Sequence, residues 1–308
     1  DPQWTTSVLY MEIAIFGFES SIAEFETNLR TASEQGFKSY WTPQIFGMDA
    51  LTAMAAIGDR VTDIRMGTAV VPTFPRHPMM LAQQALTTQS AISGRLNLGI
   101  GLAHKPVVEG MWGLKFEKPV GHLRDYLNIL MQLLHSQKVS YSGENVTGRG
   151  EITTPKTEAP PVLVAALGPQ MLRLTGQMAD GTITWMTGQT TLAELTVPTI
   201  CDAAEEAGRK KPQVVAGFPV CVTNNKDAAR ERAAREFSIY GQLPSYRAML
   251  DREGLGGPED LAIIGSAPEV AERIKAIEKT GIDSFTGSEF GNSDEKLATR
   301  EVLISLLN

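Results

Sequence analysis

Residues 12–36 read EIAIFGFESSIAEFETNLRTASEQG, an apolar run followed by an amphipathic run that ends in glycine. The first part, Glu12 to Phe18, is typical of a β-strand, and Ser21 with Glu24 forms the capping-box pattern that opens a helix. Gly36 is suited to end that helix, because it lacks the Cβ that disfavours a left-handed backbone. The stretch predicts one strand followed by one helix, whose buried face carries Ile22, Phe25, Leu29 and Ala32.

The same unit recurs along the chain, which indicates a parallel sheet whose connections are helices. The strands number eight, as a closed (β/α)8 barrel requires, so we predict an α/β TIM barrel with inserted loops. An open doubly wound sheet is the alternative, but the residues after the first strand, Phe16-Gly-Phe-Glu19, lack the glycine fingerprint expected there. The later strands are expected at 37–41, 64–71, 95–101, 161–166, 182–185, 214–223 and 283–286, and the later helices at 50–59, 78–92, 122–135, 169–178, 195–207, 227–240 and 267–279.

Two stretches interrupt the alternation. Residues 139–161 are rich in Gly, Thr and Pro and are expected to form a hairpin or loop, and residues 243–261 read as a second insertion. The composition of either segment would allow it to move over a binding site as a lid. Residues 1–10 are either a native N-terminal extension or a cloning remnant, and residues 11–308 are expected to form one barrel domain because no linker divides them.

Composition excludes several classes of function. The 308 residues carry a net charge of −7 with no block of like charges, so we expect no nucleic-acid partner. No apolar run approaches the roughly 18 residues that a membrane span needs, and the two cysteines, Cys201 and Cys221, allow one disulfide at most, so we expect a cytoplasmic protein without a membrane partner. The four histidines show no metal-ligand spacing, and we expect no metal.

In a TIM barrel the function lies at the carboxyl ends of the strands, which narrows the search for a site. The segment Thr68 to Pro78 has three prolines and must be rigid; it is either a stiff loop or a shelf for a cofactor. Gly168 and Gly188 follow adjacent strands, where backbone N–H groups at a helix start can bind a phosphate. Ordinary strand-to-helix turns are the alternative at both places.

His104, just past the fourth strand, is a candidate acid or base because imidazole exchanges a proton near neutral pH, although a purely structural histidine is equally expected. It stands where a third glycine would complete a dinucleotide fingerprint after Gly99-Ile-Gly101, and no helix is expected to open directly there. His122 and His135 lie near the ends of a helix, where a capping or surface role is expected. No nucleophile elbow or Walker loop occurs, which argues against hydrolase and nucleotide-triphosphatase chemistry.

These segments together resemble the bacterial luciferase-like superfamily, and within it the oxidoreductases that use the deazaflavin coenzyme F420. The likeness runs from residue 11 to about residue 291, and it rests on Gly67-Thr-Ala-Val-Val-Pro72, Arg76-His-Pro78, Gly94-Arg-Leu-Asn-Leu-Gly-Ile-Gly101, Val164-Ala-Ala-Leu-Gly-Pro-Gln-Met-Leu-Arg-Leu174 and Ala179-Asp-Gly-Thr-Ile-Thr-Trp185.

The resemblance implies a TIM barrel that holds the deazaflavin ring at its carboxyl end, against a non-prolyl cis peptide that aligns with Ala69-Val70. It also implies a homodimer, and it places the family's phosphate contacts at Leu167, Gly168, Met186, Thr187 and Gly188.

The chain departs from the family at two positions. Members that oxidise alcohols carry an Asp-His pair after the second strand, where this chain has Gln44, which can only hydrogen-bond a substrate or the cofactor. The pterin reductases carry a carboxylate on the first strand, where this chain has Phe16. Both substrate classes are therefore disfavoured, and the expected substrate pocket is apolar, formed by Phe16, Phe18, Trp41, Phe46, Phe74 and Trp112.

The resulting hypothesis is an oxidoreductase that transfers hydride between F420 and a small organic substrate, with the proton coming from His104 or water. Two alternatives stay open. A monooxygenase that uses reduced FMN would need the same barrel and phosphate turns, and a non-catalytic deazaflavin-binding member would explain the missing Asp-His pair and carboxylate.

Overall fold

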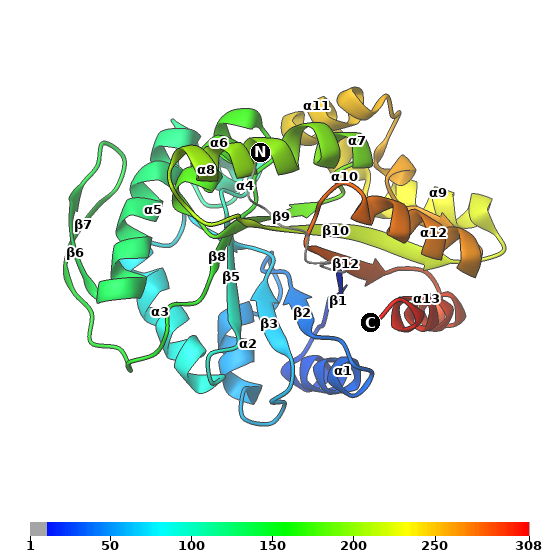
Figure 1. Ribbon diagram of the computed structural model, residues 1–308, viewed down its shortest axis with the longest axis horizontal. Coiled ribbons are helices and arrows are strands. Elements are labelled where there is room, and N and C mark those ends of the chain that lie inside the picture. Colours follow the sequence, from blue (N-terminus) through cyan, green and yellow to red (C-terminus); the bar gives the residue numbers. More distant parts are fainter. Residues whose placement is uncertain (1–10, 308) are drawn as a thin grey trace.

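The computed structural model describes residues 11–307, in which eight parallel strands close into a barrel surrounded by helices (Figure 1). Closure is made by β10, which pairs with β9 on one side and with β12 on the other, while β12 pairs with β1. The predicted TIM barrel is therefore confirmed. The barrel strands are β1 (Glu12–Phe16), β2 (Ser39–Thr42), β3 (Arg65–Thr68), β5 (Leu96–Gly101), β8 (Val162–Val164), β9 (Gly181–Trp185), β10 (Gln213–Val222) and β12 (Ser284–Glu289).

The main helices begin where local capping predicts. The Ser21 side chain accepts a hydrogen bond from the Glu24 amide at the start of α1, and Ser266 with Glu269 forms a complete capping box at α12. Gly36 follows α1 with φ of +98°, which a residue with a Cβ rarely adopts. These helices are α1 (Ile22–Glu34), α2 (Ala50–Ile57), α3 (Pro78–Ala91), α5 (Pro119–Ser136), α6 (Pro169–Met178), α8 (Val197–Glu206), α9 (Lys226–Glu236), α12 (Ala267–Glu278) and α13 (Ser293–Ser305).

Two short strands extend the sheet beyond the pattern that the sequence predicted. Strand β4 (Val71–Pro72) continues the path of β3 and pairs with the end of β5. Strand β11 (Ile263–Gly265) pairs with the last residues of β10, which runs past the level where β9 ends.

The first insertion contains the antiparallel hairpin β6 (Lys138–Ser142) and β7 (Thr147–Glu151), which packs beside α5 (Figure 1). The second is helical, with α11 (Pro244–Glu253) and the 3₁₀ turn η2 (Pro258–Asp260), and α10 (Ser238–Gln242) directly precedes it. The helix expected at 227–240 thus divides into α9 and α10. One expectation is wrong, because a short helix, α4 (Lys105–Gly110), does open directly after His104.

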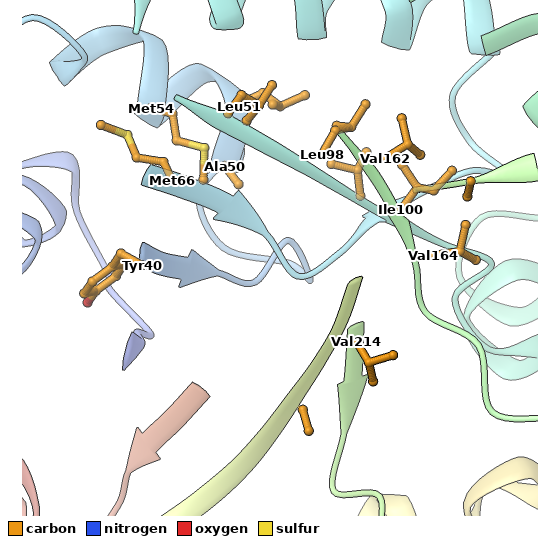
Figure 2. Close-up of a cluster of buried hydrophobic side chains, with 14 of the residues drawn as sticks. Tyr40, Ala50, Leu51, Met54, Met66, Leu98, Ile100, Val162, Val164 and Val214 are labelled. Atoms are coloured by element: carbon orange, nitrogen blue, oxygen red, sulfur yellow. The ribbon is translucent and has the colours of Figure 1, made fainter. Parts of the chain in front are cut away.

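Side chains alternate between two apolar clusters along the barrel strands. Tyr40 and Val214 belong to the large cluster between the strands and the surrounding helices, part of which Figure 2 shows. Their neighbours Trp41 and Val215 belong to a smaller cluster inside the barrel. This alternation decides which residues can face a ligand at the mouth of the barrel.

The described residues contain no helix long and apolar enough to cross a membrane. Within 11–307 no group of three or more His, Cys, Asp or Glu side chains is arranged to hold a metal ion. Cys201 is half-buried and Cys221 is buried, and both are free thiols. The first ten residues, for which an extension or a remnant was considered, lie outside the described range.

Candidate active site

The interior cluster fills the barrel below its carboxyl end with side chains from most of the strands. Phe16 of β1 and Trp41 of β2 are buried in it, and Trp185 of β9 packs against it while remaining half-buried. The cluster consists of Ala14, Phe16, Trp41, Leu163, Ile183 and Val215, with Ala69, Val70 and Trp185 against it.

The segment after β3 reaches the surface of this cluster. The peptide bond between Ala69 and Val70 is cis, as the resemblance implied. Thr68 and Val71 on either side are fully buried, whereas Ala69 and Val70 are partly exposed. These two residues therefore form an apolar ledge, which we call the Ala69–Val70 shelf, at the mouth of the barrel.

Two glycines of β5 make room for the shelf. A Cβ on Gly101 would lie 2.6 Å from Cγ2 of Val70, and a Cβ on Gly99 would overlap the carbonyl oxygen of Thr68. The Thr68 hydroxyl also donates a hydrogen bond of 2.7 Å to the carbonyl of Gly99. Glycine is required at position 99 because the backbone of Thr68 approaches β5 so closely, and at position 101 the Val70 side chain occupies the space of a Cβ.

Aromatic rings enclose one side of the mouth. The Phe16 ring lies 5.0 Å from Trp185 and 5.2 Å from Phe18, measured between centroids. The buried indole nitrogen of Trp41 has no hydrogen-bond partner in the described residues, whereas that of Trp185 faces the hydroxyl of Tyr240. A buried N–H without a partner is unfavourable, so the Trp41 indole is a donor that a bound ligand with a carbonyl oxygen could satisfy.

Trp185 is absent from the pocket that the sequence predicted, although a signal was available. It is the last residue of a predicted strand and lies two positions after Ile183, so the period of two places both side chains on the same face. The missed residue lies at the carboxyl end of its strand, where barrel sites are built.

The second insertion covers this end of the barrel. Helices α10 and α11 contribute a third apolar cluster that includes Tyr246, Met249 and Leu250 and packs on Met186, with Leu167 and Trp185 at its edge. Tyr240 of α10 lies 6.4 Å from the Trp185 ring and 4.9 Å from the Tyr246 ring. The sequence indicated an insertion here but not that its aromatic residues complete the site.

His104 lies under this cover. It is the residue before α4, its ring does not cap that helix, and the ring centroid is 6.1 Å from that of Tyr246. Burial lowers the pKa of His104 below its usual value. The neutral imidazole is therefore favoured at neutral pH, a form that can accept a proton at one nitrogen and donate from the other.

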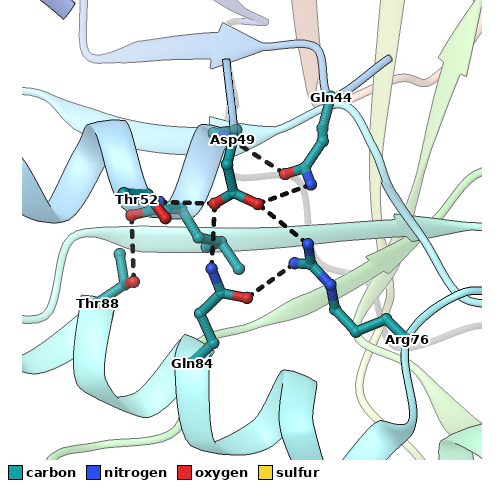
Figure 3. Close-up of polar contacts among 8 residues, drawn as sticks. Gln44, Asp49, Thr52, Arg76, Gln84 and Thr88 are labelled. Carbon is teal, nitrogen blue, oxygen red and sulfur yellow. Dashed lines mark hydrogen bonds and ion pairs between the residues drawn. The ribbon is translucent and has the colours of Figure 1, made fainter. Parts of the chain in front are cut away.

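Gln44 is part of a polar network rather than open to a ligand (Figure 3). Its amide nitrogen donates to Asp49 at 3.0 Å, and its amide oxygen accepts from the Ala50 backbone at 3.2 Å. Asp49 also accepts hydrogen bonds from Arg76 and Gln84, each at 3.0 Å. The network joins the loops after β2 and β4, and it uses one donor and one acceptor of the Gln44 amide.

Only some of the predicted aromatic residues lie together. Phe18 is half-exposed beside Phe16, but Phe46 is 60% exposed in the loop after β2. Phe74 stacks on His122 at 4.0 Å and lies 5.1 Å from Phe116, in a separate aromatic group at α5. Trp112 is half-buried after α4. The structure thus joins Phe16, Phe18 and Trp41 to the mouth and gives Phe74 a different set of contacts.

His122 differs from the capping or surface role expected for it. The residue is 9% exposed, its Nε2 lies 3.1 Å from the Thr73 hydroxyl, and burial lowers its pKa to about 4. The exposed His135 in the last turn of the same helix agrees with the expected role.

A carboxyl group does follow the first strand, at Glu19, but it faces the helices. It accepts hydrogen bonds from the Tyr40 hydroxyl and from Asn28 of α1, and burial raises its pKa. Because Tyr40 packs in the outer cluster, Glu19 does not replace the interior carboxylate that Phe16 lacks.

The two glycine turns differ in what fills them. Gly168 is the residue before α6, and a Cβ added to it would meet no atom within 4 Å. At Gly188 an added Cβ would overlap the carboxyl carbon of Glu253, from α11. The turn at Gly168 is therefore open, whereas the turn at Gly188 already holds an anionic side chain.

Comparison with known proteins gives the family. Residues 10–284 match the family described as luciferase-like monooxygenase. A proposed coenzyme F420-dependent oxidoreductase of Mycobacterium tuberculosis is 32% identical over 164 residues, which are 49% of this chain and 47% of that protein. The chain thus spans about half the length of this relative.

Solved structures share the fold at low identity. The coenzyme F420-dependent tetrahydromethanopterin reductase of Methanopyrus kandleri has a TM-score of 0.81 at 19% identity, over 96% of this chain and 98% of that one. The oxygenating constituent of 3,6-diketocamphane monooxygenase of Pseudomonas putida, in complex with FMN, has a TM-score of 0.74 at 16% identity, over 96% of each chain. Since the family match covers most of the sequence and the barrel agrees with it, the chain belongs to the luciferase-like monooxygenase family of enzymes.

Proposed function

We propose that the protein is an oxidoreductase that transfers hydride between coenzyme F420 and a small organic substrate at the carboxyl end of its barrel. The observation that carries the proposal is the Ala69–Val70 shelf, a partly exposed apolar surface backed by Gly101. An added Cβ on Gly101 would lie 3.3 Å from the Cβ of Ala165, so the shelf adjoins the segment that leads to the open turn at Gly168. A cofactor made of a flat ring and a linked phosphate needs an apolar surface for the ring, here the shelf, and an open turn for the phosphate, here the turn at Gly168.

The residues present fit such a cofactor. The unpartnered indole N–H group of Trp41 suits a carbonyl oxygen of a deazaflavin ring. Leu167 and Gly168 at the start of α6 leave space and backbone N–H groups for a phosphate. The mycobacterial relative, a proposed F420-dependent oxidoreductase, supports F420 as the cofactor.

When bound, the reduced deazaflavin supplies the hydride. The chain's own residues position the ring and the substrate. Ala69 and Val70 would support the ring, and Phe16 and Trp185 would exclude water from the site. His104, neutral because burial lowers its pKa, holds a proton on one ring nitrogen and can accept another. The apolar surroundings favour an activated alkene, imine or carbonyl compound over a charged substrate.

Equilibrium titration of the purified protein with F420 and, separately, with FMN tests the proposal, with cofactor fluorescence as the readout. We expect micromolar or tighter binding of F420. Gly168→Trp should weaken it by at least about tenfold, which corresponds to about 1.4 kcal/mol. The substitution fills open space at a φ of −87°, so the fold should tolerate it. Thr62→Trp adds the same side chain to an exposed loop at the amino end of β3 and should bind as the wild type does.

Other results would select another function. Preference for FMN, with rapid reaction of the reduced protein with oxygen, would indicate a flavin monooxygenase. Tight F420 binding without turnover of any alkene, imine or carbonyl acceptor would indicate a non-catalytic deazaflavin-binding protein. Binding of neither cofactor would overturn the assignment of the site.

Three further expectations accompany the proposal. We infer that residues from 11 onward act as one barrel domain, which limited proteolysis tests. We also infer that the protein is a homodimer, which light scattering of the purified protein tests, and that it resides in the cytoplasm, which cell fractionation tests.

A further inference from the structure

Glu253, the last residue of α11, places its carboxylate on the backbone of the helix that follows β9. One carboxylate oxygen accepts a hydrogen bond of 2.5 Å from the amide of Thr191, and the other accepts one of 3.3 Å from the amide of Thr190. The Gly188 amide points to the thioether of Met249, also on α11, at 3.4 Å. The free N–H groups at this turn are thus directed at side chains of a single element.

The helix that Glu253 meets is long enough to carry a substantial dipole. The segments α7 (Gln189–Thr191) and η1 (Leu192–Thr196) continue into α8, and the junction residues Leu192 and Val197 have right-handed helical φ and ψ values. The N-terminus of such a helix attracts anions through its free amides and its partial positive charge. A carboxylate at this point therefore takes the position that a phosphate would prefer.

The turn around the carboxylate is built closely around it. The Glu253 side chain occupies the space that a Cβ on Gly188 would take, with its carboxyl carbon nearest to that position. Thr187 and Thr191 are buried, at 0% and 1% exposure, and neither hydroxyl has a hydrogen-bond partner in the described residues. The residues of this turn thus carry buried polar groups that Glu253 does not satisfy.

A cavity beside the Glu253 side chain offers space into which the carboxylate can move. The cavity has a volume of about 200 Å³ and is lined by Gly188, Gln189 and Leu255, with Arg273 of α12 on its wall. The guanidinium of Arg273 makes no ion pair within residues 11–307 and could receive the displaced carboxylate.

We propose that Glu253 is an internal competitor for phosphate at the turn Met186–Gly188, so that it determines how strongly the protein prefers phosphorylated cofactors over their unphosphorylated forms. The identity of the cofactor rests on the proposed function, whereas the competition does not. The cover that α11 forms over Leu167 and Met186 rests on apolar packing in the third cluster and does not depend on Glu253.

The test compares wild type with Glu253→Gln and Glu253→Ala in fluorescence titrations with FMN and riboflavin, and with F420 and its phosphate-free deazaflavin. Both substitutions should raise the affinity for the phosphorylated member of each pair by about ten- to a hundredfold, which is the effect expected of charge-assisted hydrogen bonds. The affinity for the unphosphorylated member should not change. Asp251→Asn is the matched control. It removes the same charge from α11, where the Asp251 side chain pairs with Arg247 and not with the α7 amides that Glu253 binds, and it should behave as wild type.

Inorganic phosphate provides a readout that needs no cofactor. At equal ionic strength, phosphate in place of chloride should raise the melting temperature of both Glu253 variants more than that of wild type or Asp251→Asn. If no cofactor binds any variant, the proposed function fails, and the phosphate result still decides the role of Glu253. If cofactors bind but the Glu253 variants show no gain specific to phosphate in either experiment, the competition is disproved and the proposed function stands.

Discussion

The imidazole of His122 is buried against Phe74 and Thr73, and burial lowers its pKa from 6.5 to about 4, with a small opposing effect of Asp125. In the unfolded chain the ring titrates near 6.5, so between pH 6.5 and pH 4 the unfolded state binds more protons than the folded state. The titration of His122 therefore does not change stability above pH 6.5, and it lowers the free energy of unfolding progressively as the pH falls from 6.5 towards 4.

We expect His122→Gln to reduce this loss of stability on acidification. Urea unfolding midpoints measured at pH 7.5 and at pH 5 provide the test, because the change between the two pH values removes any constant cost of the substitution. His135→Gln, at an exposed position of the same helix, should keep the wild-type pH dependence. An unchanged dependence in His122→Gln would show that another group causes the acid sensitivity.

At the scale of elements, Asp49 joins α2, α3 and the loop after β4. Its side chain caps α2 by accepting from the Thr52 amide at 2.9 Å, and it also binds Arg76 and Gln84 (Figure 3). Burial acts to raise the pKa of Asp49, but the Thr52 amide and Arg76 outweigh it and lower the pKa. The carboxylate is thus stabilised as an anion in the folded protein.

Asp49→Ala should lower the free energy of unfolding by about 2 kcal/mol, because it removes a helix cap and leaves Arg76 and Gln84 without their acceptor. Urea unfolding measures the loss. Glu26→Ala removes a carboxylate that binds the exposed side chains of Arg30 and Arg60, and it should leave stability near that of wild type. Equal effects of the two substitutions would show that the Asp49 network is no stronger than a surface ion pair.

The elements that the sequence predicted are those with local signals. The Ser21 and Ser266 caps, the apolar runs and Gly36 are recognisable without knowledge of the rest of the chain. Strand β11 has only three residues and forms because β10 extends beyond β9 and offers a free edge, a feature of the assembled sheet. Helix α11 lies in the predicted insertion 243–261, which has no strong periodic pattern, so its packing on Met186 could not be predicted from residue order.

In the candidate site, too, residues with a local sequence signal were predictable and those placed by long-range contacts were not. Phe16 and Trp41 lie on strands, where the period of two indicates the barrel interior, and both are there. Phe46 and Phe74 lie in loops, whose paths depend on contacts with α5 and on the Asp49 network, and the sequence alone does not distinguish their surroundings from the mouth. Glu253 is more than sixty residues from Gly188 in the chain, and only the folded structure brings the two together.

At the scale of the whole molecule, the proposed site belongs to one closed sheet. The open turn at Gly168 follows β8, the shelf follows β3, and both are joined through β5, which pairs with each strand. The closure of the barrel through β10 links these strands to the rest of the fold. A ligand that binds here only in the folded state must therefore stabilise the entire barrel against unfolding.

A cofactor present at 100 times its dissociation constant adds about 2.7 kcal/mol to the free energy of unfolding, which for a chain of this size raises the melting temperature by roughly 5 °C. Thermal unfolding with and without F420, followed by circular dichroism, measures the shift. Thr62→Trp should show the same shift, and Gly168→Trp should show almost none, since its indole fills the space at the start of α6. A full shift in Gly168→Trp would mean that the cofactor stabilises the barrel from a different site, and the assignment of the phosphate turn would then be wrong.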